Sequence, residues 1–287
     1  MTDLLNILIL GTIWGAVYSL IAVGFTLIFG VAGIVNLSHG AFYMLGAYLA
    51  YTFMTILKIN VPLAALMAVA GVAAVGMAID YLGIRPMRER HAYVLILTLA
   101  FALFFQELMY GIYGPYGKPV QSFIKGGFVI GRIDISYQKL ITLFVAATLV
   151  ALLWIFIKKT RTGKSISAVA QNKDASILVG IQYEKIYRMT MAISAALAAT
   201  AGVFISPILE AVPTMWSFPL FKAFAIVIIG GLGSMEGAII ASLLLGYSET
   251  LVSILISANY SDMVYLIAII LILALRPTGL LARGRAQ

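Results

Sequence analysis

Side chains capable of acid–base, nucleophilic or metal chemistry are scarce in this sequence and lie far apart. Its 287 residues include only 11 Asp and Glu, two His and no Cys. The absence of Cys excludes disulfides, thiolate metal sites and cysteine nucleophiles. His39 and His91 are too distant in sequence to form a metal-ligand motif. Because no nucleophile–base pair or metal-ligand cluster emerges, we expect no enzymatic activity, no metal and no cofactor.

One carboxylate falls near the middle of an apolar run. Glu107 lies in the sequence Phe-Phe-Gln-Glu-Leu-Met, and an ionisable residue at membrane depth is a functional hypothesis by default because it is costly there. We expect it to be protonated, or paired with a basic residue from another helix. Glu210 and Glu249 lie nearer the ends of their runs, which favours an interfacial position. A proton-coupled carrier would usually need several mid-span carboxylates, so Glu107 alone supports that function weakly.

Two glycine-rich stretches interrupt the apolar runs and could line a solute pathway. Residues 30–40 contain Asn36 and His39, and residues 230–237 read Gly-Gly-Leu-Gly-Ser-Met-Glu-Gly. Glycines at membrane depth permit close helix packing, which we favour for most of them. They also permit a helix break at a cavity, where free backbone amides could receive a carboxylate. His39 is equally explained as a core histidine bonded to a neighbouring carbonyl. The candidate pathway residues are Asn36, His39, Glu107, Gly230, Gly231 and Gly233.

Two short motifs imitate nucleotide-binding loops. Gly163-Lys-Ser resembles the end of a P-loop, but that motif needs a glycine five residues earlier, where Lys158 stands. Gly231-Leu-Gly begins like a dinucleotide fingerprint, but Glu236 occupies the place of its last glycine. Any ATP hydrolysis linked to this chain is therefore expected in a separate protein.

The elements that must position these residues are membrane helices. The chain is 62% hydrophobic and 10% charged, with a mean hydropathy of +1.05, whereas ordinary globular chains are about a quarter charged. A spanning helix needs about 20 mostly apolar residues, and only helices or closed barrels satisfy the backbone in lipid. We expect one all-α, polytopic membrane domain over residues 1–287 with eight or nine helical elements, two of them broken. The expected apolar runs are 4–29, 41–57, 63–82, 92–113, 140–157, 189–209, 221–229, 238–256 and 263–275.

The first run is expected to be a retained helix, not a signal peptide, since Asp3 stands where a basic segment would precede cleavage. The longest gap early in the chain, residues 114–138, has alternating apolar residues at 128–135, which indicate a short hairpin.

The basic residues predict the orientation. Thirteen of the 19 Lys and Arg residues fall in residues 85–90, in residues 158–188 and in the tail from Arg276, which includes Arg283 and Arg285. Cytoplasmic loops carry an excess of Lys and Arg, so we expect a multi-pass protein of the inner membrane with its N-terminus outside and its C-terminus in the cytoplasm. Residues 114–138 are then external. The net charge of +8 lies in gaps between apolar runs and therefore does not indicate nucleic-acid binding.

Residues 158–188 form the longest charged stretch and are too polar to span a membrane. Ile166, Val169, Ala170 and Lys173 recur at helical spacing, which predicts a short amphipathic helix. Asp174 is a candidate helix cap, and Gly180 a candidate left-handed helix end. Such a helix suits insertion into a groove of another protein, while an ordinary solvated loop explains the same composition.

Five ordered stretches resemble one family. They are Asn36-Leu-Ser-His-Gly40 with Tyr43-Met-Leu-Gly46, Arg85-Pro-Met-Arg88, the 158–181 segment, Lys222-Ala-Phe with the 230–238 glycine motif, and Arg276-Pro-Thr-Gly279. Together they resemble the branched-chain amino acid permeases of ATP-binding-cassette importers, closest to the LivH type. The resemblance implies a pore formed with a second, sister permease, two cytoplasmic ATPase subunits and an external solute-binding protein.

The resemblance also implies that residues 158–188 couple the permease to the ATPases. The coupling candidates are Arg161, Gly163, Lys164, Ala168, Ala170, Asp174, Ala175 and Gly180. The expected cargo is a branched-chain or related amino acid, with the individual solute left open. The alternative is a self-sufficient secondary transporter or channel for a small polar solute, which would need no partner.

Overall fold

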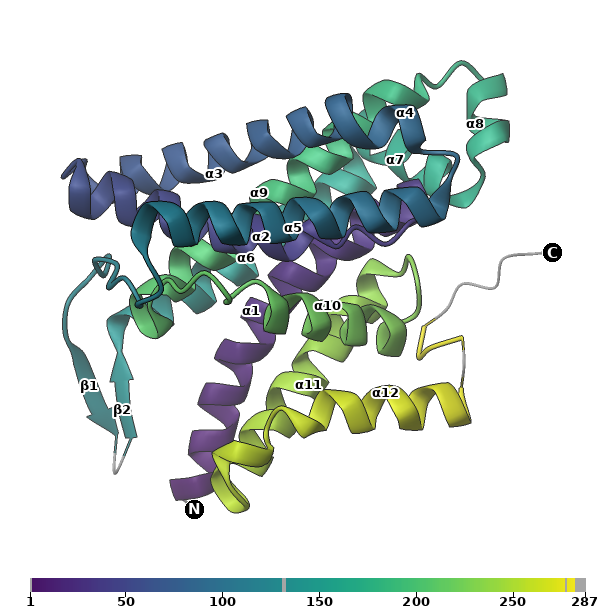
Figure 1. Ribbon diagram of the computed structural model, residues 1–287. Helices are drawn as coiled ribbons and strands as arrows, with labels where there is room; N and C mark the ends of the chain where they lie inside the picture. The colour runs from purple at the N-terminus through teal and green to yellow at the C-terminus, as the bar shows by residue number, and fades with distance from the viewer. Residues whose placement is uncertain (1, 131–132, 277, 282–287) are drawn as a thin grey trace.

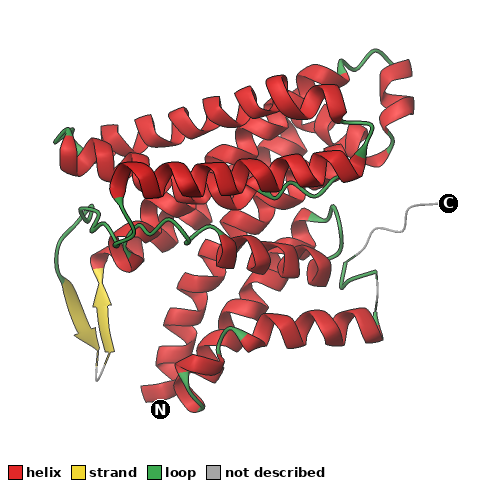
Figure 2. Ribbon diagram, in the orientation of Figure 1, coloured by secondary structure: helices red, strands yellow, loops and turns green. Residues whose placement is uncertain are grey.

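A computed structural model describes residues 2–130, 133–276 and 278–281 (Figure 1). Figure 2 shows that nearly all of this chain is helical, which confirms the all-α expectation. Seven helices of the described chain are long and apolar enough to cross a membrane. Arg132, Pro277, Arg283 and Arg285 lie outside the described residues.

The helices follow the predicted apolar runs closely, because an uninterrupted apolar run in lipid must satisfy its own backbone as a helix. In chain order they are α1 (Thr2–Ala32), α2 (Ser38–Tyr51) with a π-helical turn (Thr52–Ile56), α3 (Val61–Ile79) with a second π-helical turn (Asp80–Ile84), α4 (Arg85–Met87), α5 (His91–Tyr113), α6 (Tyr137–Lys159), α7 (Arg161–Gln171), α8 (Lys173–Leu178), α9 (Tyr183–Leu209), α10 (Ser217–Gly230), α11 (Met235–Leu255) and α12 (Met263–Leu275).

The predicted hairpin is confirmed. Strands β1 (Gly127–Ile130) and β2 (Ile133–Ser136) pair in antiparallel fashion, with Phe128 opposite Ile135. Two other boundaries differ from the prediction. Helix α1 continues past Gly30, so that the first break is only residues 33–37 and Gly40 lies inside α2. Helix α9 begins at Tyr183, so the connecting segment is shorter than residues 158–188.

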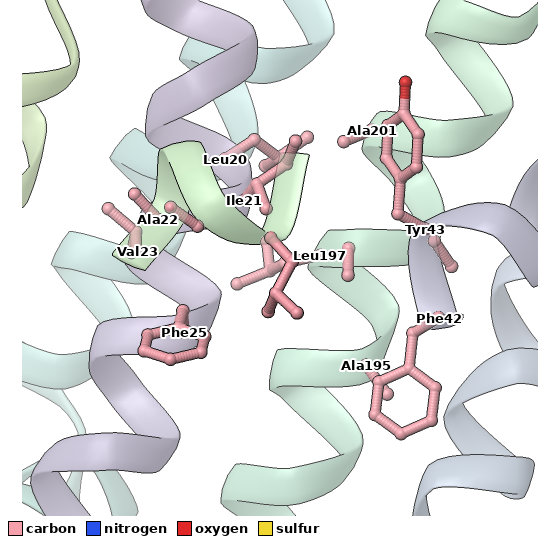
Figure 3. Close-up of a cluster of buried hydrophobic side chains, with 14 of the residues drawn as sticks. Leu20, Ile21, Ala22, Val23, Phe25, Phe42, Tyr43, Ala195, Leu197 and Ala201 are labelled. Carbon is pink, nitrogen blue, oxygen red and sulfur yellow. The ribbon is translucent and has the colours of Figure 1, made fainter. Parts of the chain in front are cut away.

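The core lies where α1, α2 and α9 pack together, and Figure 3 shows part of it, with Phe25, Leu197 and Phe42 projecting from the three helices. Small residues allow this close approach. A Cβ atom at Gly202 would collide with the carbonyl oxygen of Tyr43, and one at Gly46 would collide with the backbone of Ala199. The glycines inside these helices therefore serve packing.

The outer helices leave most of their apolar surface uncovered. Only 6% of the α12 span and 22% of the α5 span are buried, against 67% for α1. Exposed Leu266 and Ile270 on α12 and exposed Leu103 and Phe104 on α5 illustrate this surface. A protein surface of this kind requires lipid or another apolar partner.

The connections collect at two opposite ends of the helix bundle. One end, here called the basic end, comprises residues 33–37, 85–90, 158–182, 231–234, 276 and 278–281. It is held together by an ion pair between Lys158 and Glu236 (2.9 Å) and by a hydrogen bond from the Leu280 amide to the Ile229 carbonyl (2.8 Å). The other, the hairpin end, comprises residues 57–60, 114–130, 133–136, 210–216 and 256–262. The backbones of Lys118 and Ala211 pair there.

Candidate functional site

Helices α7 and α8 form a compact, capped unit at the basic end. The Gly163 amide donates to the Thr160 hydroxyl (3.0 Å), which caps α7, and the Ala175 amide donates to the Asn172 side chain (3.0 Å), which caps α8. Asp174 was therefore the wrong cap, since Asn172 stands at the residue before the helix. Gly180 has φ of +86°, which confirms the predicted left-handed end of α8.

The amphipathic prediction is confirmed for α7, but the predicted helix also included Lys173, which begins α8. Ile166 and Val169 are buried against the membrane helices, and the Ala170 methyl group faces Gly30 of α1. Gly163 is also buried, because a Cβ atom there would collide with the carbonyl oxygen of Phe156. It packs the first turn of α7 against the end of α6 and is not available to a partner protein. The other coupling candidates are at least partly accessible: Arg161, Lys164, Asp174, Ala175 and Gly180 are exposed, and Ala168 and Ala170 are half-buried.

The most exposed apolar side chains of this segment lie at the end of α8. Leu178 is 87% exposed and Val179 78% exposed, and Ile177 beside them is about half exposed. We call these three residues the apolar tip. They stand in an otherwise polar stretch, and exposed apolar residues clustered in such a place mark an interaction site.

Arg88 ties the 85–90 turn to α9. Its guanidinium donates to Asp80 (2.8 Å) and Glu184 (3.0 Å) and stacks on the Tyr187 ring at 3.6 Å. Glu184 also pairs with Arg85 at 3.1 Å. Burial lowers the pKa of Arg88, but the charges of Asp80, Tyr187 and Glu184 outweigh burial and raise it above its ordinary value. The guanidinium therefore stays charged and holds the turn in place.

The first helix break is built around Asn36 and His39. The Asn36 side-chain oxygen accepts from the amide (3.0 Å) and hydroxyl (2.6 Å) of Ser38, which starts α2. His39 is fully buried, with Nε2 3.0 Å from the Ile21 carbonyl and Nδ1 3.1 Å from the Ser194 hydroxyl. This is the core histidine bonded to a carbonyl that the sequence left as one alternative, and both ring nitrogens are occupied.

The second break is a tight turn between α10 and α11. Gly231 and Gly233 have φ of +101° and +82°, values that favour glycine. Cβ atoms at Gly230 and Gly237 would each collide with the backbone of the other. Packing therefore explains Gly230, as the sequence favoured, while Gly231 and Gly233 form the turn. Gly30 of α1 lies against Gly233, so the last turn of α1 packs on the second break at the basic end.

Glu107 does not have the expected ion pair. Its side chain is exposed on α5 and accepts a hydrogen bond from the neighbouring Gln106 amide (3.2 Å). It lies on the uncovered face of this helix, where lipid or another chain would contact it. Pairing with a basic residue of another helix was one of the two alternatives for Glu107, and the described chain does not contain that pair.

A buried charge cluster joins four helices instead. Lys222 of α10 lies 3.0 Å from Glu249 of α11, 3.1 Å from Asp262 at the start of α12 and 3.1 Å from the Tyr18 hydroxyl of α1. Tyr18 donates to Glu249 at 2.6 Å. Lys222 and Glu249 are 12% and 7% exposed, so both side chains are buried between the helices. Among the described residues no group of three or more His, Asp and Glu could hold a metal ion.

The sequence profile of the permease component of branched-chain amino acid transport systems matches residues 7–273. The chain belongs to this family. The match covers both helix breaks, α7, α8 and the buried cluster, and the permease is accordingly a multi-pass membrane protein with seven candidate spans in its described part.

Full-length relatives carry the same description. BraD of Pseudomonas aeruginosa, a high-affinity branched-chain amino acid transport system permease protein, is 32% identical over 98% of this chain and 96% of its own. LivH of Escherichia coli is 30% identical over 96% and 95%. The ribose import permease RbsC of Escherichia coli is 28% identical over 91% and 82%. These relatives are transport permeases, not enzymes.

Sequence reasoning missed two groups in this permease. The apolar tip was inside the predicted coupling segment, and three consecutive large apolar residues in a polar stretch were the available signal. Lys222 and Glu249 were also visible as ionisable residues inside apolar runs. Their pairing was hidden because it depends on how α10 packs against α11.

Proposed function

We propose that the chain is the membrane-spanning subunit of an ATP-binding-cassette importer for branched-chain or chemically related amino acids. The observation that carries this proposal is the family match over residues 7–273, together with the names of BraD and LivH. We propose a class of solutes and not a single solute, because a ribose permease is also similar over most of the chain.

The importer contains a second permease, a sister chain in our proposal, with two cytoplasmic ATPase subunits and an external solute-binding protein. The large uncovered apolar surfaces of α5 and α12 support contact with lipid and with this second permease. Glu107 lies on the uncovered face of α5, so we retain it as a pathway candidate at the boundary between two permeases.

The N-terminus faces outside and the basic end faces the cytoplasm. Residues 85–90 and 158–182 carry eight of the 19 Lys and Arg residues and lie at one end, which supports this orientation through the positive-inside rule. The natural chain has no Cys, so single cysteines give a clean test. An impermeant maleimide should label Tyr116→Cys at the hairpin end of intact spheroplasts, and Lys164→Cys only after permeabilisation. The reverse pattern would overturn the orientation.

Movement of the ATPases reaches the permease through α7 and α8. We assign the main contact to the apolar tip, which inserts into a groove on the ATPase as an amphipathic helix does. The exposed coupling candidates Arg161, Lys164, Asp174 and Ala175 add further contacts to the ATPase.

The tip can be tested with a matched pair of variants. Val179→Asp should abolish co-purification of the ATPase subunits and solute-stimulated ATP hydrolysis. Val129→Asp is the control, because Val129 is similarly exposed (68% against 78%) but lies in the hairpin at the other end. Equal behaviour of the two variants would refute the docking role of the tip.

The pathway passes the two helix breaks, with Asn36, Gly231 and Gly233 at its mouth in the basic end and His39 holding the neighbouring helices. The decisive experiment for the whole proposal is reconstitution in liposomes. ATP-dependent uptake of leucine should require both permeases, the ATPases and the binding protein. Uptake by this chain alone, driven by a proton or sodium gradient, would favour the self-sufficient transporter instead.

A further inference from the structure

A cleft of about 910 Å³ opens at the basic end, between the 85–91 turn and the segment from Lys173 to Arg188. Figure 1 draws α4 and α8 at this same end. The end of α1 closes the cleft at Ala32, and Ile177 and Ile181 provide apolar lining. Three separate parts of the chain therefore build one concave site.

The lining carries an excess of positive charge. Five cationic side chains line the cleft against two carboxylates: Arg85, Arg88, Lys173, Lys185 and Arg188 against Glu89 and Glu184. Arg85 and Arg88 already share Glu184. Within the described chain, Lys173, Lys185 and Arg188 form no ion pair, and Lys173 instead lies over the Tyr183 ring at 4.6 Å. Three cations are thus available to an anionic ligand.

The cleft lies at the depth where a bilayer has its headgroups. One candidate span ends at Met87, and others begin at His91 and Tyr183. Tyr81 and Tyr93 beside the cleft are 56% and 55% exposed, and Arg85 and Arg90 lie over their rings. Exposed tyrosines paired with arginines are typical of the membrane–water interface. Basic pockets between spanning helices at this depth bind anionic lipid headgroups.

We propose that this cleft binds a phosphate group, and that anionic phospholipid of the surrounding leaflet supplies it. Lysine binds phosphate through its point charge, and arginine binds it through two parallel N–H donors of its planar guanidinium group. The exposed Leu82 side chain (75%) on the same span offers the acyl chains an apolar surface. A bound headgroup would bridge the 85–91 turn and the start of α9. Where the proposed function holds, the headgroup therefore lies beside the coupling segment.

The binding test needs neither transport nor partner proteins, so it stands or falls separately from the proposed function. The purified full-length chain is titrated with phosphatidylglycerol, with phosphatidylcholine and with inorganic phosphate, and bound lipid is counted by native mass spectrometry. The test variant is Lys173→Gln/Lys185→Gln/Arg188→Gln. The control, Lys58→Gln/Lys118→Gln/Lys125→Gln, removes the same charge at the hairpin end.

Each basic residue near an anionic headgroup is worth about fivefold in binding, so the test variant should bind phosphatidylglycerol roughly 100-fold more weakly. The control should retain most of its affinity, and phosphatidylcholine should not compete. Competition by inorganic phosphate at millimolar concentration would support recognition of the phosphate group. If phosphate saturates the site and no lipid binds, the proposal that a phospholipid supplies the phosphate group is overturned. Equal loss in both variants refutes the site.

Two further measurements keep the result interpretable. Thermal unfolding of the test variant without lipid should match that of the parent chain, since Lys173, Lys185 and Arg188 are exposed. If the variant does unfold early, the single change Lys185→Glu replaces it and should weaken binding at least fivefold, and an unchanged affinity refutes the site. Displacement of bound phosphatidylglycerol by purified ATPase subunits would identify a protein as the natural occupant and overturn the proposal.

Discussion

Removing Lys222 alone should destabilise the permease more than removing Lys222 and Glu249 together. In Lys222→Met, Glu249 keeps the Tyr18 hydroxyl but loses its cation, and its other carboxylate oxygen is already buried without a hydrogen-bond partner. The side chain is 7% exposed, so water cannot replace the lost partner. Asp262, at 55% exposed, can be solvated when Lys222 is gone.

The expected magnitudes follow from the cost of an unpaired buried charge. Breaking a buried ion pair by removing one partner costs about 3–5 kcal/mol, while replacing both by apolar residues of similar volume is often neutral. In Lys222→Met/Glu249→Leu the Tyr18 hydroxyl still loses its acceptor, which costs about 1–3 kcal/mol. Adding Tyr18→Phe should remove that remaining cost. The order of stability is therefore parent, triple, double and then single variant.

The assay is unfolding in mixed micelles by titration with SDS, followed through the fluorescence of the three Trp residues. Lys125→Met, an exposed lysine at the hairpin end, controls for the loss of one positive charge and should change stability little. If the stability loss of Lys222→Met/Glu249→Leu equals the sum of the losses of Lys222→Met and Glu249→Leu measured separately, the two side chains act independently. That result would refute the buried pair and the packing of α10 on α11 that creates it.

Three further predictions use the same unfolding assay. Gly202→Ala should lower the free energy of unfolding by about 1–3 kcal/mol, because the new methyl group collides with Tyr43. The control Gly111→Ala has open space around it and should leave stability unchanged or raise it by up to about 1 kcal/mol. Equal effects of the two variants would contradict the tight crossing of α2 and α9. Arg88→Leu should cost about 3–5 kcal/mol because buried Asp80 loses its partner, whereas exposed Arg90→Leu should be near neutral, and similar losses would mean that the pair is solvated. Asn172→Ala should cost about 1 kcal/mol within α8 alone, seen as faster hydrogen exchange of residues 173–178, and a matching fall in global stability would show that α8 does not unfold independently.

The sequence predicted the spans well because the criterion is local. About 20 apolar residues without a partner for their backbone can only be helical in lipid, and alternation was enough to find the hairpin. Boundaries near glycine were less certain. Gly30 and Gly40 suggested a long break, but both lie in helices. Gly40 lets α2 approach Trp216, because a Cβ atom there would collide with the Trp216 carbonyl oxygen. That role depends on segments that no local pattern identifies.

The sequence did not predict the charge pairs, because they too depend on which helices pack together. Glu107 was chosen as a candidate because it lies nearest the middle of an apolar run. The structure places it on an exposed helix face, where it has no ionic partner in the part of the chain that the structure describes. Lys222 and Glu249 lay nearer the ends of theirs, but their helices pack together and exclude water from both. Burial of an ionisable group is decided by the neighbouring helix, which makes its distance from the middle of a run a poor criterion.

Helix α9 connects the basic end to the core, and it is long enough to transmit movement between them. It starts three residues after Gly180, at the end of the segment that carries the apolar tip, and its 27 residues extend about 40 Å into the bundle. Along that length Glu184 and Tyr187 hold Arg88 at the basic end, Ser194 lies against His39, and Gly202 packs on Tyr43. A stiff helix that contacts the 85–90 turn near one end and the core further along cannot tilt without moving α2 with it. We therefore expect force applied at the apolar tip to reach His39 through α9 and not through the connections of the basic end.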